Sequence, residues 1–182
     1  MYDLVFPKNN EAEYIKQANK LGYSELVFVY SEKAFNSAPK ANPIAEKHVI
    51  KIVKGSFCEK KFVTSEYSVS NNSKFIKQGI KLLYGVETTE SYMHQRASGL
   101  NESLAKSVKE KGIFYGINFS ELIESKRRAE LLGSIMQNIM LCKKLDIPIV
   151  IASFAASPDL MRNPQDLIAF GRILQVQKTV NL

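Results

Sequence analysis

The sequence predicts an α/β fold, in the form of a small and irregular (β/α) barrel of the TIM type. Short apolar runs alternate with segments whose apolar residues recur at helical spacing, which is the pattern of parallel strands linked by helices. Two runs, Leu26–Tyr30 and Ile147–Ala152, are apolar throughout, as in strands buried on both faces. We count seven candidate strands in 182 residues. Because TIM barrels take roughly 200 residues or more, we expect some outer helices to be missing or replaced by loops.

The first strand is expected at Leu4–Phe6, and a helix follows it. Asn10 and Glu13 have the spacing of a capping box, in which the two side chains bond the backbone at the start of a helix. Apolar residues then recur on one helical face as far as Gly22, and glycine is the residue that most often ends a helix. The run Leu26–Tyr30 is the second expected strand.

The middle of the chain has weaker signals. Residues 31–46 are typical of a loop, and strands are expected at His48–Val53 and Lys61–Glu66, only seven residues apart. Parallel neighbours need a crossover of about a dozen residues or more. This pair is therefore either a hairpin or a place where the assignment is wrong. A short helix at Ser73–Gly79 and a strand at Ile80–Val86 follow.

The second half is more regular. A helical stripe over Leu100–Val108 ends at Gly112, and a strand is expected at Ile113–Phe119. A second stripe over Leu131–Met140 is much more typical of core packing than of a cofactor site.

The end of the chain begins with the strand Ile147–Ala152. Asn163 is a good helix cap, and Pro164 suits the first position of the helix that follows. Residues 175–182 have no core pattern, so we expect this tail to fray. With no interdomain linker in view, the whole chain, residues 1–182, is predicted to be a single barrel domain.

Composition limits the classes of partner only loosely. The chain carries 25 Lys and Arg against 18 Asp and Glu, a formal net charge of +7, which weakly favours polyanions. The densest positive stretch, Lys40–Lys61, is either a solvated surface or a phosphate-facing patch. No apolar run approaches the roughly 20 residues of a membrane span, no secretory signal is visible, and Cys58 and Cys142 are too few for a disulfide framework. We therefore expect a cytoplasmic protein with no membrane partner.

The residues offer little catalytic machinery. The chain has two histidines, and it lacks metal-binding His or Cys spacings, a phosphate-binding glycine loop and a nucleophile elbow. Glu66, Glu87 and His94 lie at or after strand ends, where barrel enzymes place catalytic groups. They make the best case for an enzyme, but the preferred interpretation is that they are solvated or paired loop residues. We predict that this chain provides no catalytic residue and no metal ligand, and binds no cofactor.

A better case exists for binding a phosphate backbone. Loops at residues 87–99, 120–126 and 153–163 follow candidate strands on what would be one rim of the barrel, and they carry or adjoin arginines, which suit bidentate contact with phosphate. The predicted RNA-binding residues are Arg96, Lys106, Lys126, Arg127, Arg128, Arg162 and Arg172. An alternative for Arg162 is to pair with Asp166 or to cap local carbonyls, and an alternative for Arg172 is to cap the end of a helix.

Five groups of residues between Ser98 and Gly171 have the order and spacing of one known family. They are Ser98-Gly99-Leu100-Asn101 with Leu104-Ala105-Lys106; Gly112-Ile113 to Phe119-Ser120; Arg128-Ala129 with Leu131-Leu132 and Asn138; Pro148-Ile149-Val150-Ile151 with Ser153 and Ala155; and Arg162 with Pro164, Asp166-Leu167-Ile168-Ala169 and Gly171. The last group is the most specific. In these motifs the chain resembles the family of ribonuclease P protein component 3. Before Ser98 only Asp3-Leu4 and the helix end at Leu21-Gly22 are similar.

The resemblance implies a barrel related to metal-dependent phosphoesterases that has lost the metal ligands. It implies a subunit of ribonuclease P, the ribonucleoprotein that removes 5′ leaders from precursor tRNA. In that family the RNA performs the chemistry with Mg²⁺, and the protein joins a small partner subunit to stabilise the catalytic RNA. The expected partners are thus the ribonuclease P RNA, precursor tRNA through the complex, and that small subunit. A phosphoesterase-like hydrolase and a barrel that only scaffolds proteins are the alternatives.

The chain departs from the family pattern in three places. Phe154 stands where the family strand usually ends with Gly, and Gly133 and Met136 stand where the family helix often has basic residues. The chain is also shorter through residues 31–70. The first departure predicts an altered loop, and the second predicts that some RNA contacts are missing.

Overall fold

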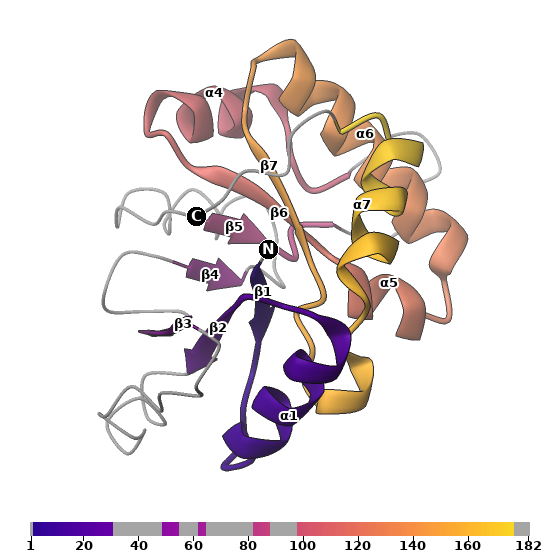
Figure 1. Cartoon of the computed structure of the whole chain (residues 1–182). Coiled ribbons are helices and arrows are strands. Elements are labelled where there is room, and N and C mark those ends of the chain that lie inside the picture. The colour runs from indigo at the N-terminus through magenta and orange to yellow at the C-terminus, as the bar shows by residue number, and fades with distance from the viewer. Residues whose placement is uncertain (1, 31–48, 55–61, 65–81, 88–97, 177–182) are drawn as a thin grey trace.

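Seven parallel strands form two sheets in the computed structural model of the chain, which describes residues 2–30, 49–54, 62–64, 82–87 and 98–176. One sheet has the order β1-β2-β3, with β1 at Tyr2–Val5, β2 at Glu25–Tyr30 and β3 at Val49–Lys54. The other has the order β4-β5-β6-β7, with β4 at Phe62–Thr64, β5 at Leu82–Tyr84, β6 at Phe114–Asn118 and β7 at Ile149–Ala152. The helices are α1 (Glu11–Leu21), α4 (Glu102–Glu110), α5 (Phe119–Glu124), α6 (Arg128–Lys144) and α7 (Pro164–Ile173), with a 3₁₀ turn at Pro158–Leu160 (Figure 1).

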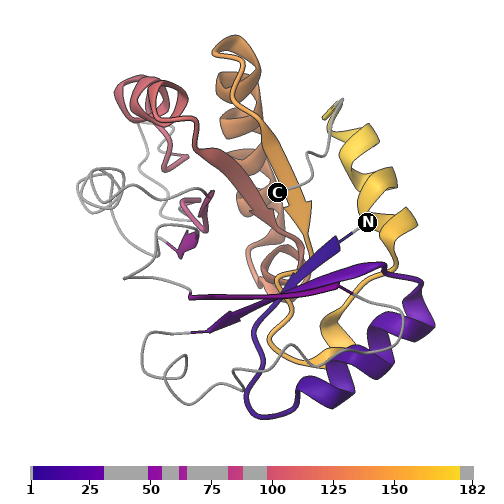
Figure 2. The ribbon, with the colours of Figure 1, turned by 60° about the vertical axis from the view of Figure 1, so that its left-hand side comes forward.

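The two sheets meet where β1 lies beside the end of β7. Val5 forms a single parallel bridge with Ala155, and the Phe6 N–H donates to the Ala155 carbonyl at 2.9 Å. Figure 2 shows the two sheets meeting there at a steep angle. The spatial order is thus β4-β5-β6-β7-β1-β2-β3, which is the cyclic order of a barrel opened between β3 and β4. The α/β prediction is confirmed, whereas closure of a barrel is not seen in the described residues.

β3 and β4 are the two edge strands at this opening. The hairpin alternative is wrong, because β3 pairs in parallel with β2 and β4 pairs in parallel with β5. The seven residues 55–61 are also too few for the crossover that would make β3 and β4 parallel neighbours. The strands themselves were predicted correctly, and only their pairing was not. The helix expected at Ser73–Gly79 lies outside the described residues.

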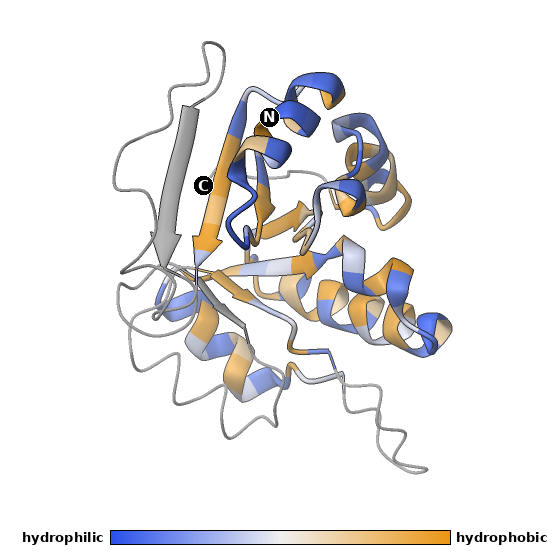
Figure 3. Cartoon of the chain, turned by 90° about the horizontal axis from the view of Figure 1, so that it is seen from below, coloured by the Kyte–Doolittle hydropathy of each residue, from blue (hydrophilic) through white to orange (hydrophobic). Residues whose placement is uncertain are grey.

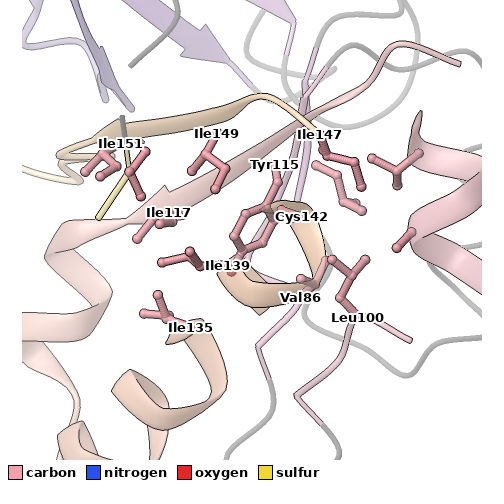
Figure 4. Close-up of a cluster of buried hydrophobic side chains, with 14 of the residues drawn as sticks. Val86, Leu100, Tyr115, Ile117, Ile135, Ile139, Cys142, Ile147, Ile149 and Ile151 are labelled. Carbon is pink, nitrogen blue, oxygen red and sulfur yellow. The ribbon is translucent and has the colours of Figure 1, made fainter. Parts of the chain in front are cut away.

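β2 and β7 are buried on both faces, as the apolar runs Leu26–Tyr30 and Ile147–Ala152 predict. Figure 3 shows strands that are largely apolar and helices that are apolar along one side. Ile149 and Ile151 pack toward α4, α6 and α7, while Val150 and Ala152 pack between the two sheets with Leu4 and Val29. Figure 4 shows the helix-side core, where Ile135, Ile139 and Cys142 of α6 lie against Tyr115 and Ile117 of β6.

Most predicted helix ends are confirmed. Gly22 ends α1 in the left-handed conformation (φ 77°), and Asn163 caps α7 by accepting the Gln165 N–H at 2.9 Å. The capping box at Asn10 is wrong, because the Asn10 side chain accepts the Lys8 N–H at 2.9 Å and caps no helical N–H. The asparagine thus stabilises the turn before the helix rather than the helix itself.

Two expected loops contain ordered structure. Residues 120–126 were expected as a loop, but α5 begins at Phe119 because the Asn118 side chain accepts the Glu121 N–H at 3.1 Å. The fraying expected from residue 175 is not seen at Val176, which is buried in the helix-side core and whose N–H donates to the Gly171 carbonyl at 2.8 Å. Residues 177–182 lie outside the described residues. No helix in the described part of the chain is long and apolar enough to span a membrane.

Among the glycines with a tested Cβ position, Gly99 is the one at which an added side chain would collide most severely with the backbone. It has φ +90°, and a Cβ there would stand 1.6 Å from the Val86 carbonyl oxygen at the end of β5. Asn101 follows it and caps α4 by accepting the Leu104 N–H at 2.8 Å. The Ser98–Asn101 turn is therefore pressed against β5 before α4 starts.

We predict that Gly99→Ala lowers the free energy of unfolding by about 3 kcal/mol or more, because the methyl group must displace a strand backbone. Gly22→Ala is the matched control: it has a similar positive φ but no atom within 4 Å of the added Cβ, so its cost is about 1 kcal/mol. Denaturant unfolding of both variants measures the difference. Equal losses would show that Gly99 is required only for its φ.

Candidate functional site

The carboxyl ends of the parallel strands hold three groups of side chains that bear on function. Strands that run in one direction bring the loops after them to one edge, which is where α/β barrels bind their ligands. The three groups are a buried carboxyl at the junction of the sheets, a stack of aromatic rings, and a polar cluster behind β5. Among the predicted basic residues that the structure describes, Lys106, Lys126, Arg127, Arg128 and Arg172 are exposed and Arg162 is half-buried.

Asp3 holds the junction of β1 and β7. Its side chain is fully buried, and its Oδ1 accepts the Leu4 N–H at 2.9 Å and the Ser153 N–H at 2.7 Å, while Oδ2 accepts the Ser153 hydroxyl. Burial raises the pKa of Asp3 to about 6, against the opposing effect of the hydrogen bonds from Ser153. The hydroxyl of Tyr23, also near Asp3, donates to the Arg162 carbonyl at 2.7 Å. One carboxyl thus ties the first strand to the loop after the last.

Aromatic rings fill the space between the sheets at the same edge. Phe154 stacks on Tyr84 with ring centroids 4.4 Å apart, and Phe6 lies 6.1 Å from Tyr84 and 6.2 Å from Phe154. Phe154 is only 2% exposed. Its φ is +50°, a conformation that favours glycine, which explains the glycine of the family pattern at this position. Here the packing of the ring offsets the backbone strain of roughly 1–2 kcal/mol.

Glu87 belongs to a polar cluster behind β5. Its carboxylate accepts the Tyr115 hydroxyl, and the Asn138 amide donates to the Ser98 carbonyl at 3.0 Å and to the Tyr115 hydroxyl oxygen at 3.3 Å. Burial is the main cause that raises the pKa of Glu87 to about 7. The cluster joins β5, β6, α6 and the Ser98–Asn101 turn. Glu87 therefore has a structural role here, while Glu66 and His94 lie outside the described residues.

The cluster Lys126–Arg128 lies between α5 and α6, and its three side chains have different surroundings. The Arg128 guanidinium donates from Nε to the Leu122 carbonyl at 3.1 Å and from Nη2 to the Ile123 carbonyl, so it caps the end of α5. Arg127 forms an ion pair with Glu130 at 3.4 Å, with about half of each side chain exposed. Lys126 is exposed.

The other predicted RNA-binding residues are more scattered. Arg162 is half-buried, and its Nε is buried without a hydrogen-bond partner in the described structure. Lys106 pairs with Glu102 at 3.5 Å on α4, and Arg172 is exposed in the last turn of α7, at the end opposite Arg162. Arg96 lies outside the described residues. The Ser120 N–H donates to the Ser153 carbonyl at 3.0 Å, so the segments that follow β6 and β7, and with them Lys126–Arg128 and Arg162, share the carboxyl edge.

The most strongly connected polar residues were missed as site residues by the sequence analysis. Asp3 and Asn138 were noted only as matches to a family pattern, and Tyr115 and Tyr23 were not singled out. A signal does exist for Asn138, which interrupts the apolar stripe Leu131–Met140 at a core position and is fully buried. Within the described ranges, no three His, Cys, Asp or Glu side chains are grouped so that they could hold a metal ion.

Comparison with known proteins identifies the family of the chain. The family model described as RNase P subunit p30 matches residues 88–180, which is just over half of the sequence. The chain belongs to this family. The match includes α4, β6, α5, α6, β7 and α7, and it confirms the resemblance drawn from the motifs between Ser98 and Gly171.

Curated relatives of this p30-family chain include proteins of Methanosarcina mazei and Methanocaldococcus jannaschii. Ribonuclease P protein component 3 of Methanosarcina mazei is 34% identical over 85 residues, covering 46% of this chain and 36% of that protein. The protein of the same name from Methanocaldococcus jannaschii is 32% identical over 78 residues, covering 42% and 34%. The chain thus matches about a third of the length of these curated relatives.

A solved structure extends the likeness to the first half. A chain of the cryo-EM structure of archaeal ribonuclease P with mature tRNA superimposes with a TM-score of 0.65 at 23% identity, covering 96% of this chain and 83% of that one. At this identity the likeness concerns the fold. It includes the strands before residue 88, which lie outside the family match.

The titration of Asp3 yields a pH-dependent prediction. Its pKa in the folded chain, about 6, lies above the ordinary 3.8, so the folded state binds this proton more tightly than the unfolded state. The stabilisation is complete below about pH 4 and is lost as pH rises through 6; a shift of this size corresponds to about 3 kcal/mol. Asp3→Asn removes this change but keeps an acceptor for both N–H groups.

We therefore expect the free energy of unfolding of Asp3→Asn to fall less than that of the wild type between pH 4 and pH 6.5. Denaturant unfolding at several pH values measures both curves, and their difference cancels the contribution of Glu87. Asp159→Asn, on the exposed 3₁₀ turn, controls for the loss of one carboxylate. Parallel curves for Asp3→Asn and wild type would contradict a buried, proton-binding Asp3.

The two neighbouring arginines should differ in stability. Arg128→Ala leaves two carbonyls at the end of α5 without their donor, so we expect a loss of about 1–2 kcal/mol. Arg127→Ala removes only an exposed ion pair, worth about 0.5 kcal/mol or less. Thermal and denaturant unfolding of the single variants tests this order, and a larger loss for Arg127→Ala would refute the assignment of the α5 cap to Arg128.

Proposed function

We propose that this chain is a protein subunit of ribonuclease P, the ribonucleoprotein that removes 5′ leaders from precursor tRNA. In this proposal it binds and stabilises the catalytic RNA in the cytoplasm, together with a small partner subunit, and it is not catalytic alone. The observation that carries the proposal is membership of the p30 family over residues 88–180. The Mg²⁺ that the reaction needs would be held by the RNA.

The charge of the molecule supports RNA binding. The net charge is +7, and Lys126 and the half-exposed Arg127 project from the corner between α5 and α6. Arg127 is held by a surface ion pair, which is weak enough for a phosphate to replace its partner. Arg128 contributes by fixing the corner on which both residues stand. Lys106 and Arg172 would form additional, separate contacts.

The interior of the carboxyl edge supports a non-catalytic role. In barrel enzymes this space holds substrate and catalytic side chains, whereas here it is filled by Phe6, Tyr84 and Phe154. The alternative, a metal-dependent phosphoesterase-like hydrolase, would use Glu66, Glu87 and His94, but the Glu87 carboxylate is already bonded to Tyr115. Incubation of the purified chain alone with Mn²⁺ or Mg²⁺ and model phosphoesters separates the two functions, since only the hydrolase predicts turnover.

Reconstitution tests the proposed function directly. The cognate ribonuclease P RNA is assayed for cleavage of precursor tRNA at low Mg²⁺, with and without this chain and the small partner subunit. We expect the proteins to lower the Mg²⁺ concentration that half-maximal cleavage requires. If the chain leaves cleavage and Mg²⁺ dependence unchanged while the other protein subunits support activity, the proposal is wrong.

For the RNA contact itself we predict that the double variant Lys126→Glu/Arg127→Glu binds the RNA more weakly than the wild type. Each lost phosphate contact reduces the slope of log K against log salt by about 1. Lys16→Glu/Lys20→Glu, at two exposed positions of α1, is the charge-matched double control. Filter binding between 50 and 300 mM salt measures the slopes. A slope equal to wild type would exclude the α5–α6 corner from the interface.

A further inference from the structure

The outward face of α6 carries an apolar stripe that no described part of the chain covers. We define the stripe as Ala129, Gly133, Met136 and Met140. All four residues are exposed, and the two methionines expose 51% and 72% of their surface. At 100° per residue the four positions lie within an arc of roughly 60°. They face almost directly away from the core residues of α6, which include Ile135, Asn138 and Cys142.

The spacing of the stripe is that of a helix-packing face. Its members are separated by four, three and four residues, which is the spacing by which one helix packs along another. Exposed methionines are unbranched and polarisable, and they suit adaptable contact with apolar side chains. Single exposed apolar residues are normal on a protein surface. Here Met136 and Met140 lie on the same helical face as Ala129 and Gly133, so the four form a continuous surface.

Gly133 is an independent sign of a close approach. It lies in the middle of a 17-residue helix, where glycine costs about 1 kcal/mol relative to alanine. Its φ is not positive, and apart from its chain neighbours and the backbone of its own helix no described atom lies within 4 Å of the position of a Cβ. Nothing inside the described fold therefore requires a glycine there. Together with Ala129 one turn earlier, Gly133 leaves the helix surface without large side chains, so a second backbone can approach closely.

The charges around the stripe indicate what covers it. Lys143 and Lys144 are exposed and lie on either side of the stripe beyond Met140, and the segment 126–144 holds five Lys and Arg against one Glu. Lys144 also forms an exposed ion pair with Glu102 of α4 at 3.6 Å, a weak contact that a partner's carboxylate can replace. A second copy of α6 laid along the stripe would bring these positive charges together in a parallel pair, and would set Lys143 and Lys144 near Lys126 and Arg127 in an antiparallel pair. The stripe is about 16 Å long, too short to supply by itself the roughly 1,600 Å² of a standard interface. Both points disfavour a dimer of this chain.

We propose that the stripe is a docking surface for an amphipathic helix of a protein partner, with an apolar face of about three turns and carboxylates beyond the end that meets Lys143 and Lys144. This adds to the proposed function a surface for a protein subunit, and it does not depend on RNA binding. The methionines supply the apolar contact, Gly133 allows the close approach, and the lysines set the direction of the bound helix.

Two synthetic helical peptides test the proposal. Both carry leucines at the four-three-four spacing over three turns; one ends in a cluster of glutamates and the other in a cluster of lysines. Binding to the full chain is measured by fluorescence anisotropy at 50 and 300 mM salt. We expect the glutamate peptide to bind at least tenfold more tightly than the lysine peptide, and salt to reduce the difference.

The variants locate the contact. Met136→Glu/Met140→Glu should weaken the glutamate peptide at least tenfold, and Ile173→Glu, which changes the 78%-exposed apolar residue of α7, should leave it unchanged. Equal thermal stabilities of the variants confirm that the surface alone was altered. The proposal fails if neither peptide binds at 100 μM, if both bind equally, or if Ile173→Glu weakens binding as much.

Two further outcomes would assign the stripe to another occupant. Self-association of the wild-type chain at micromolar concentration that is lost in Met136→Glu/Met140→Glu would indicate a second copy. Weaker binding of the ribonuclease P RNA by that variant than by Ile173→Glu would indicate an RNA contact. Failure of the RNA reconstitution with retained peptide binding would overturn the proposed function and leave this surface standing.

Discussion

The junction between β1 and β7 is the constraint on which the rest of the fold depends. In the described residues the two sheets are joined there by one backbone bridge, Val5 to Ala155, and by the Asp3 carboxyl bonded to Ser153. Within the described residues, β3 and β4 do not pair, so they form no second connection between the sheets. A fully buried carboxyl is an expensive way to hold a junction, because each deprotonation leaves a charge away from water. This burial raises the pKa of Asp3 to about 6, although the hydrogen bonds from Ser153 and Leu4 oppose the shift.

The same junction explains why Phe154 tolerates its backbone conformation. The residue stands between Ser153, bonded to Asp3, and Ala155, bonded to Phe6, so its two neighbours are fixed on both sides. A residue so constrained adopts a positive φ because the alternatives would break one of these contacts. The ring then finds Tyr84 at stacking distance. The space that a barrel enzyme keeps open for a ligand is in this way part of the core.

Prediction from the sequence worked where the signal was local. The continuous apolar run Ile147–Ala152 predicted a strand buried on both faces, and Gly22 and Asn163 predicted their helix ends, because these features depend on a few neighbouring residues. Pairing of β3 and β4 depends on residues far apart in sequence, so no local pattern fixed it. Asn10 shows where local patterns fail to predict structure. An asparagine side chain can accept a backbone N–H of a turn or of the first turn of a helix, and the residue type does not say which.

The basic residues show that residue type alone also does not predict the role of a side chain. Arg127 and Arg128 are identical in type and adjacent in sequence, yet one guanidinium is half-exposed beside Glu130 and the other closes the end of α5. RNA contact by these arginines stays a prediction, and the sequence alone does not show that their two side chains have different surroundings in the fold. For Met136 and Met140 of α6 the sequence pattern predicted core packing, but both side chains are exposed. In the sequence they belonged to a core stripe, and it is their position opposite Ile135 and Cys142 that turns them into a surface.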